Sequence, residues 1–204
     1  MNLENLVILI SGQKRSGKDY VSSIIKEYLE KKNIKTEIKG LADSLKQVIS
    51  GTFDISLEQL DIYKNNPGEF PILITQEEQT FKQIDFRYLL QRFGTEGVKP
   101  VFGDDIWAIT LLEKCLKSFN DGTGVILVPD FRFLVEYETF KSERLFDNIN
   151  CKTIKILNKN ITNSDAHISE NELNDFAFDF YIDNSERDNK EHILRQLDEI
   201  FKQK

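Results

Sequence analysis

A glycine-bounded segment with a lysine near the N-terminus has the residue types that bind phosphate. Residues 12–19 read GQKRSGKD and fit the first seven positions of the phosphate-loop pattern G-x-x-x-x-G-K-[ST]. In such a loop, backbone N–H groups surround an anion, the lysine reaches the β and γ phosphates of a nucleotide, and a helix N-terminus lies behind them. An ordinary glycine-rich turn is the alternative, and the residues on either side of the loop weigh against it.

The eighth position departs from the pattern, because Asp19 replaces the serine or threonine whose hydroxyl normally holds Mg²⁺. A carboxylate can serve the same hard cation directly or through a water molecule. It can equally be an acidic residue in the first turn of a helix, where it interacts favourably with the helix dipole by ~0.3–1 kcal/mol. The sequence leaves both readings of Asp19 open.

The elements that position this loop follow from the apolar pattern. An apolar β-branched run at residues 6–11 predicts a buried strand, and helical spacing predicts a helix from residue 18 to about 32. Further strands are expected at 36–39, 125–129, 153–157 and 178–182, and further helices at 42–50, 86–93, 104–119, 134–146 and 189–202. This alternation predicts an α/β fold with a mostly parallel sheet covered by helices on both faces. Ligands of such sheets bind beyond the carboxyl ends of the strands.

Length and composition predict one domain, with residues 42–120 forming a helical or irregular subdomain. Residues 51–83 have poor periodicity and contain two proline turns. No apolar run is long enough to span a bilayer and the first residues are not basic, so we expect a soluble protein of the cytoplasm. Cys115 and Cys151 lack metal-site spacing and are expected to be buried free thiols.

The charge balance argues against a nucleic-acid duplex as partner. The chain has 27 basic and 34 acidic residues and a net charge of −7, and residues 165–188 alone hold eight acidic residues and one arginine. Duplex binding needs clustered Lys and Arg. The acidic excess still allows a locally basic cleft for a small anion.

Beyond the loop, several segments in order resemble the bacteriophage deoxynucleoside monophosphate kinases. The loop itself is similar to their G-x-K-R-S-G-K-D, and the remaining segments are LADSLK at 41–46, RYLLQRFGTE at 87–96 with Trp107 downstream, VPDFR at 128–132, HISE at 167–170 and IDN at 182–184. Tyr20 stands where the family usually has threonine, Lys99 where it often has arginine, and residues 52–83 do not align. The resemblance runs from about residue 7 to the C-terminus and implies a P-loop nucleotide-kinase fold.

The resemblance implies transfer of the ATP γ-phosphate to a deoxynucleoside 5′-monophosphate, with Mg²⁺, by a phage-encoded enzyme of the host cytoplasm that supplies DNA precursors. It implies that ATP is bound by Gly12, Lys14, Arg15, Ser16, Gly17, Lys18, Asp19 and Tyr20. Lys18 would bridge the β and γ phosphates, and Arg132 would clamp the acceptor phosphate or the charge that develops on transfer. Asp130, at the end of a hydrophobic strand, resembles a Walker B carboxylate and is the second candidate for Mg²⁺.

The resemblance further implies that the subdomain at 42–120 lies on the acceptor side. It implies that the acceptor nucleotide is bound by Lys46, Arg87, Gln91, Gly94, Thr95, Trp107 and Arg132. From the residues alone, Arg87 and Gln91 could be an exposed helix face followed by a glycine cap at Gly94. Trp107 could stack on the base or pack in the core.

Three expectations concern the C-terminal third. Ser169 and Glu172 match a capping box, so His167 beside them is given no catalytic role. Lys155 and Lys159 are candidates for the cation of a lid over the ATP phosphates. A kinase of another small phosphorylated metabolite and a non-catalytic nucleotide-binding regulator stay open as alternatives, and so does a homodimer.

Overall fold

The structure is a computed structural model, and it describes residues 2–66, 74–75, 81–82, 85–142, 149–161, 172–186 and 189–202. Contacts between Cα atoms divide the chain into two compact units. Unit 1 comprises Met1–Leu41 and Ala108–Lys204, and unit 2 comprises Ala42–Trp107. Residues 108–120, which we expected in the acceptor-side subdomain, therefore pack in unit 1.

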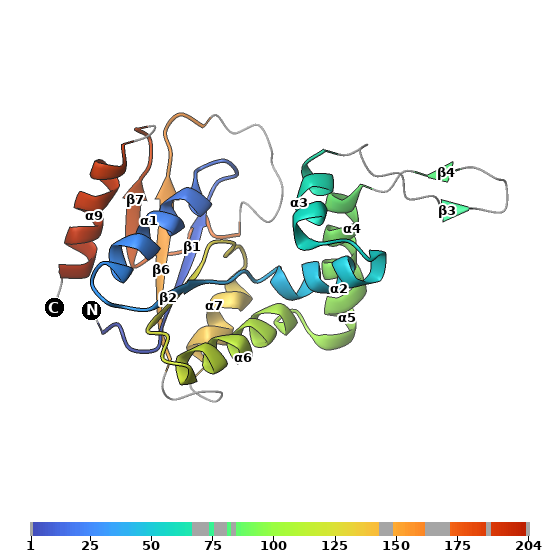
Figure 1. Cartoon of the computed structure of the whole chain (residues 1–204), viewed down its shortest axis with the longest axis horizontal. Helices are drawn as coiled ribbons and strands as arrows, with labels where there is room; N and C mark the ends of the chain where they lie inside the picture. Colours follow the sequence, from blue (N-terminus) through green and yellow to red (C-terminus); the bar gives the residue numbers. More distant parts are fainter. Residues whose placement is uncertain are drawn as a thin grey trace. The chain divides into compact units, whose positions relative to one another are not determined.

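Unit 1 is built on a five-stranded sheet in which every strand pair is parallel (Figure 1). Its order is β2-β5-β1-β6-β7, with β1 at Leu6–Gly12, β2 at Thr36–Ile38, β5 at Val125–Val128, β6 at Asn150–Leu157 and β7 at Phe180–Asp183. The chain leaves the central strand β1 for the edge strand β2, returns to β5 on one side of β1, and then forms β6 on the other side. The connections diverge at the carboxyl end of β1, the position where sheets of this kind bind ligands.

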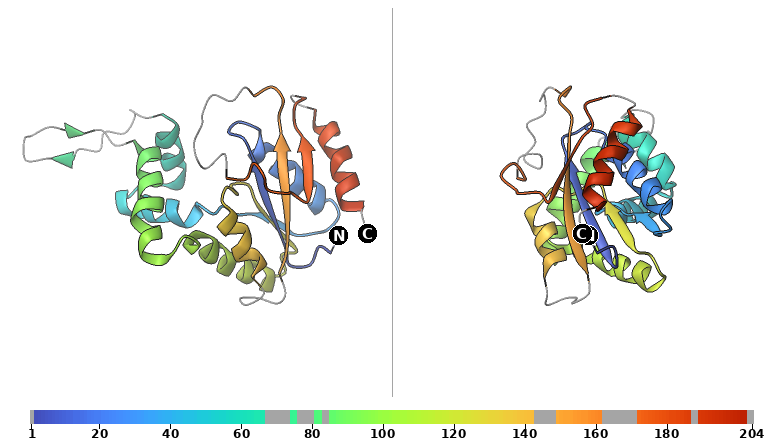
Figure 2. Two further views of the ribbon diagram at one scale, coloured as in Figure 1. Left: turned by 180° about the vertical axis from the view of Figure 1, so that it is seen from behind. Right: turned by 90° about the vertical axis from the view of Figure 1, so that its left-hand side faces the viewer.

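Helices cover both faces of this sheet, because alternate residues of its buried strands point to opposite sides. Leu6, Ile8 and Ile10 pack in one apolar cluster with α1 (Lys18–Glu30) and α9 (Lys190–Lys202). Val7 and Leu9 pack in a second cluster with α6 (Ile106–Asn120) and α7 (Leu134–Lys141). Figure 2 shows these layers from behind and from the side.

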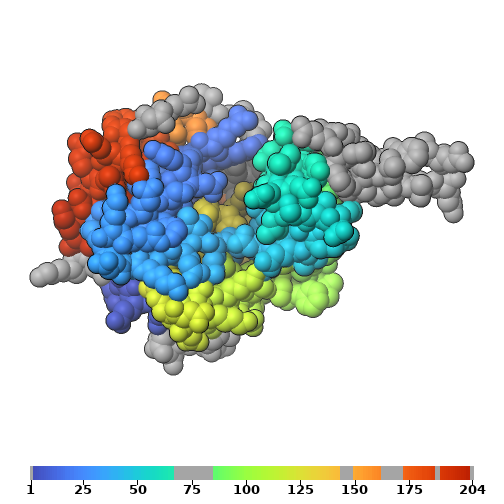
Figure 3. Space-filling view, viewed as in Figure 1, coloured from blue at the N-terminus to red at the C-terminus, as the bar shows by residue number. Residues whose placement is uncertain are grey.

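The predicted α/β fold with a parallel sheet is confirmed, and most elements lie within a few residues of the expected ranges. Helix α1, which lies in the blue part of Figure 3, follows β1 after a five-residue loop. It has an apolar face against the sheet and a charged face at the surface. The helix expected at 134–146 ends earlier, at Lys141, where Ser142 turns to extended backbone. Within the described residues no helix is long and apolar enough to cross a membrane.

Unit 2 is a small helical unit with its own core. It contains α2 (Asp43–Phe53), α3 (Leu57–Asn65), α4 (Phe86–Arg92), the π-helix η1 (Phe93–Val98) and α5 (Lys99–Phe102), with a two-stranded hairpin of β3 (Ile74–Thr75) and β4 (Phe81–Lys82). Its apolar core is formed by the buried side chains of Leu45, Ile49, Leu60, Phe86 and Leu90.

The sequence did not predict α3. Its N-terminus carries a capping box in which Ser56 Oγ accepts from the Gln59 N–H at 3.1 Å and Gln59 Oε1 accepts from the Ser56 N–H at 2.8 Å. The S-x-x-Q pattern was the available signal. The apolar periodicity was weak because Leu60 is the one fully buried residue of this helix.

Both cysteines are buried free thiols, as predicted. Burial in apolar surroundings raises the pKa of each thiol to about 12. Such thiols are protonated at neutral pH and are poor nucleophiles.

Candidate active site

The loop between β1 and α1 is tightly packed at its first residue, Gly12. Gly12 and Gly17 have positive φ angles of 155° and 87°, and Arg15 adopts the left-handed conformation at 68°. A Cβ atom on Gly12 would lie 2.7 Å from the Ile156 carbonyl oxygen and 2.8 Å from Ser16 Oγ. The glycine at position 12 is therefore required for close packing as well as for its backbone conformation.

Lys18 and Ser16 contribute polar groups to this loop. Lys18 Nζ donates hydrogen bonds to the carbonyl oxygens of Gly12 at 2.7 Å and Gln13 at 3.0 Å, so the ammonium group lies over its own loop. The hydroxyl of Ser16 is buried and has no hydrogen-bond partner among the described residues. A buried hydroxyl without a partner is unfavourable by ~1–3 kcal/mol, and an anion oxygen would accept from it. These groups fit a bound phosphate.

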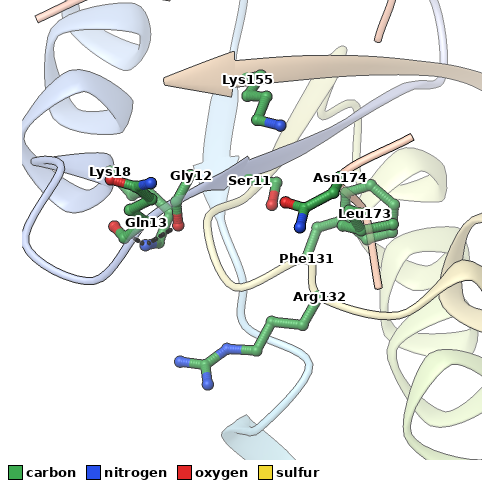
Figure 4. A pocket seen from close by; sticks show the side chains of 9 residues that line it. All are labelled: Ser11, Gly12, Gln13, Lys18, Phe131, Arg132, Lys155, Leu173 and Asn174. Atoms are coloured by element: carbon green, nitrogen blue, oxygen red, sulfur yellow. Dashed lines mark hydrogen bonds between the residues drawn. The ribbon is translucent and has the colours of Figure 1, made fainter. Parts of the chain in front are cut away.

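Beside the loop lies a shallow hollow of about 70 Å³ at the carboxyl ends of the central strands (Figure 4). It is lined by Ser11, Gly12, Gln13, Lys18, Phe131, Arg132, Lys155, Leu173 and Asn174. Lys18, Arg132 and Lys155 thus reach one site from three different segments. The hollow has the scale of a phosphate group rather than of a whole nucleotide, since nucleotide-sized pockets measure roughly 300 Å³ or more.

Arg132 is positioned by the cap of α7. The backbone N–H groups of Arg132 and Phe133 both donate to Glu136 Oε2, at 2.8 and 3.0 Å, and the Leu134 N–H donates to Glu172 Oε1 at 3.0 Å. Figure 4 shows the Arg132 guanidinium extended away from Phe131. It forms no ion pair with a carboxylate in the described part of the chain.

Asp130 lies next to the end of β1. Its Oδ1 accepts a hydrogen bond from the Leu41 N–H at 2.9 Å, and the following N–H, of Phe131, donates to the Ile10 carbonyl oxygen at 3.3 Å. The carboxylate therefore ties the segment after β2 to the segment after β5. Asp19 is exposed in the first turn of α1.

These two carboxylates are the candidate Mg²⁺ ligands. In the described ranges, no group of three or more His, Cys, Asp or Glu side chains could hold a metal by itself. Mg²⁺ at nucleotide sites needs one or two carboxylates together with phosphate oxygens and waters, so Asp19 and Asp130 suit it in type and number. The ion would neutralise phosphate charge when bound with a nucleotide.

The other expected ATP contacts lie on the outer side of the loop. Lys14 and Arg15 are exposed, and Tyr20 is 42% exposed on the first turn of α1. Their contact with ATP stays a prediction.

In unit 2, Lys46 belongs to a cluster that the sequence did not reveal. Asp61 Oδ1 lies 3.2 Å from Lys46 Nζ and 3.0 Å from Lys64 Nζ. Partial burial by itself would raise the pKa of Asp61, but the two ammonium groups outweigh this and hold the pKa below its usual value. Arg87 donates to Asn65 Oδ1 at 3.2 Å, next to Lys64 in the chain. Helix α3 thus brings Lys64 and Asn65 to the residues predicted to bind the acceptor.

Arg92 has a local role. It donates to Glu96 Oε2 from Nε at 2.7 Å and to the Tyr88 hydroxyl at 2.8 Å, and these bonds raise the pKa of its guanidinium. The neighbouring Gln91 is exposed on α4.

Gly94 does not cap a helix. The helical path continues through η1 and α5 and ends at Gly103, whose φ is 104°. Gly94 is buried, and a Cβ there would lie 2.7 Å from Leu45 Cδ2, so a larger residue would displace the end of the Leu45 side chain of α2. Gly94 and the exposed Thr95 lie in a π-helix, a rare element that is frequent at functional sites.

Trp107 packs against the apolar core of unit 2 and donates from Nε1 to the Gly94 carbonyl oxygen at 3.1 Å. Trp107 therefore connects the core of unit 2 to the π-helix, and stacking of its ring on the acceptor base stays a prediction.

The two lid candidates differ. Lys155 is on β6 and lies at the hollow, with Nζ 5.2 Å from the centre of the Phe178 ring. Lys159 is largely exposed and pairs with Asp183 Oδ2 at 3.1 Å. His167 and Ser169 lie outside the described residues, whereas Glu172, expected in their capping box, caps α7.

A parallel sheet with this strand order, a glycine-bounded loop at the end of its central strand and a lysine over that loop define a P-loop nucleotide-binding protein. The sequence model of the deoxynucleotide monophosphate kinase family matches residues 61–192. The chain belongs to this family of nucleotide kinases.

Two other comparisons add little. No curated protein sequence matches the chain. Among solved structures, a mutant of the APS kinase CysC of Mycobacterium tuberculosis is similar, with 11% sequence identity and a TM-score of 0.43 over 97% of this chain and 95% of that one. The family match begins at residue 61, so the phosphate loop and the family assignment are independent observations.

Proposed function

We propose that the protein transfers the γ-phosphate of ATP to deoxynucleoside 5′-monophosphates, giving the diphosphate and ADP. The observation that carries the proposal is the phosphate loop of unit 1, with its buried Ser16 hydroxyl and the Lys18 ammonium over the loop carbonyls, in a chain of the deoxynucleotide monophosphate kinase family.

On the ATP side, the N–H groups at the start of α1 and the Ser16 hydroxyl would bind the phosphates. Lys18 would exchange its two carbonyl partners for the β and γ phosphates. Arg132 and Lys155 add two positive charges at the hollow, and these would stabilise the negative charge of the phosphoryl group in the transition state. Asp19 and Asp130 would hold Mg²⁺, which supplies charge neutralisation.

On the acceptor side, Lys46 and Arg87 would bind the monophosphate, and Gln91, Gly94 and Thr95 would contact the sugar or base. Support comes from the cluster of Lys46, Lys64 and Arg87 around α3 and from the π-helix that carries Gly94 and Thr95. The sheet and its loop do not determine which base is accepted.

The proposal is tested by incubating the purified protein with Mg·ATP and each deoxynucleoside monophosphate, and measuring ADP and the diphosphate. Ribonucleoside monophosphates and other phosphorylated metabolites form the comparison panel. Turnover of at least one deoxynucleotide, faster than its ribose counterpart, supports the proposal. Turnover only of a different metabolite, or ATP binding with no transfer to any acceptor, would overturn it.

A variant pair assigns the chemistry to the loop. Lys18→Met removes the cation that bridges the phosphates, and we expect kcat to fall at least 100-fold, about 2.7 kcal/mol of transition-state stabilisation. Lys31→Met, at an exposed lysine just after α1, is the matched control and should keep full activity. Equal activity of the two variants would contradict the loop assignment.

A further inference from the structure

The residue that follows β7 makes direct contact with the phosphate loop. The Asn184 side-chain nitrogen donates to the Ser16 carbonyl oxygen at 2.8 Å, and Asn184 is 9% exposed. A carbonyl oxygen can only accept, so the amide nitrogen must be the atom that faces it. The same amide lies against Gly17, where an added Cβ would overlap the Asn184 nitrogen. Position 17 therefore needs a glycine for its neighbour as well as for its φ angle.

Hydrogen bonds fix the backbone at Asn184 and at the residue before it. Its backbone N–H donates to the Leu157 carbonyl oxygen at 2.8 Å. The Gln196 side chain accepts from the Asp183 N–H at 2.8 Å and donates to the Asp183 carbonyl oxygen at 3.0 Å. The Ser185 N–H donates to Asp183 Oδ1 at 2.9 Å. Asn184 thus projects from a connection that is fixed to both β6 and α9.

The hydrogen bond acts on a peptide unit that matters for anion binding. In a planar trans peptide the carbonyl oxygen and the following N–H point in opposite directions. A bond that fixes the direction of the Ser16 carbonyl therefore also fixes the Gly17 N–H, which points in the opposite direction within the same peptide plane. That N–H is one of the first donors of α1, and such donors have no partner within the helix.

We propose that Asn184 is a positioning residue for the phosphate loop: it holds the Ser16–Gly17 peptide in the orientation that binds the phosphates of ATP. The inference rests on the proposed function only in that the loop binds ATP. It assigns a role to the IDN segment at 182–184, which neither the loop motif nor the composition explains. Pre-organised donors of this kind bind an anion without first reorganising.

The test compares ATP binding of Asn184→Asp and Asn184→Leu with the wild type. Both variants approximate the shape of asparagine and remove the amide donor, and only the first adds a charge. We expect the Kd for a fluorescent ATP analogue to rise at least tenfold in both, and the KM for ATP to rise with it, whereas the KM for the acceptor stays within twofold. A purely structural role would lower kcat through loss of folded enzyme and leave both KM values unchanged.

Asn150→Asp is the matched control. Asn150 also donates its amide to a backbone carbonyl, that of Glu4 at 3.1 Å, but at the opposite end of β6. It should bind ATP like the wild type. If the Asn184 variants also bind ATP like the wild type, the inference is wrong. If the wild type binds no ATP, the proposed function fails, and the two failures are thereby distinguished.

Discussion

The tight packing around Gly12 in the phosphate loop allows a quantitative prediction for Gly12→Ala. The added methyl carbon would lie 2.7 Å from the Ile156 carbonyl oxygen and 2.8 Å from Ser16 Oγ. These distances are 0.7 and 0.6 Å shorter than the 3.4 Å at which ordinary van der Waals contact begins. One of these atoms belongs to the backbone of β6, which cannot move independently of the sheet. We therefore expect the loop to move instead.

The size of the effect follows from this displacement. Overpacking a well-packed site costs ~1–3 kcal/mol, so the free energy of unfolding should fall by about 2 kcal/mol. A shift of about 0.6 Å also takes loop N–H groups from good hydrogen-bond distance to beyond its limit, and bonds to charged groups contribute ~1.5–3 kcal/mol each. The Kd for ATP should therefore rise at least tenfold, because each tenfold corresponds to ~1.4 kcal/mol.

Urea unfolding and titration with a fluorescent ATP analogue measure the two quantities. Gly51→Ala is the matched control: Gly51 lies within α2, its added Cβ would have no neighbour within 4 Å, and alanine is the better helix former by ~0.5–1 kcal/mol. The control should be slightly more stable and bind ATP unchanged. Binding by Gly12→Ala within twofold of the wild type would refute the reasoning.

Two further predictions concern stability and the acceptor side. The Glu37 carboxylate pairs with Lys39 Nζ at 2.8 Å and accepts from the hydroxyls of Thr123 at 2.5 Å and Ser118 at 3.0 Å, and these bonds lower its pKa to about 2. The contribution of the Glu37 carboxylate to folding stability is therefore present above pH ~4.5 and is lost as the pH falls toward 2. In urea unfolding, Glu37→Gln should lower the free energy of unfolding by about 2 kcal/mol at pH 7 and by much less at pH 3. An equal loss of stability at both pH values would contradict this. In Gly94→Ala, the added methyl group would overlap the Leu45 side chain. The free energy of unfolding should fall by about 1 kcal/mol, and the KM for the acceptor should rise while the KM for ATP stays unchanged. A stabilised variant with an unchanged acceptor KM would show that the close contact between Gly94 and Leu45 is not needed.

Much of unit 1 was predictable because its signals are local. The β-branched run and the helical spacing around the loop predicted β1 and α1 with ends within two residues of those observed. In unit 2 the signals were weaker. In a sequence, a glycine that ends an amphipathic helix cannot be distinguished from a glycine at which another helix packs closely. For Gly94 the structure distinguishes the two roles, because Leu45 of α2 packs against it.

The sequence by itself determined the parallel α/β fold, the phosphate loop and its lysine, since each depends on residues that are neighbours in the chain. Only the tertiary structure decided which distant groups complete the sites. Asn184 meets the Ser16 carbonyl across 168 positions, Lys155 reaches the hollow because β6 lies beside β1, and Asp61 joins Lys46 because α3 packs on α2. Such pairs leave no periodic pattern, because their contact depends on the order of the strands and the packing of the helices.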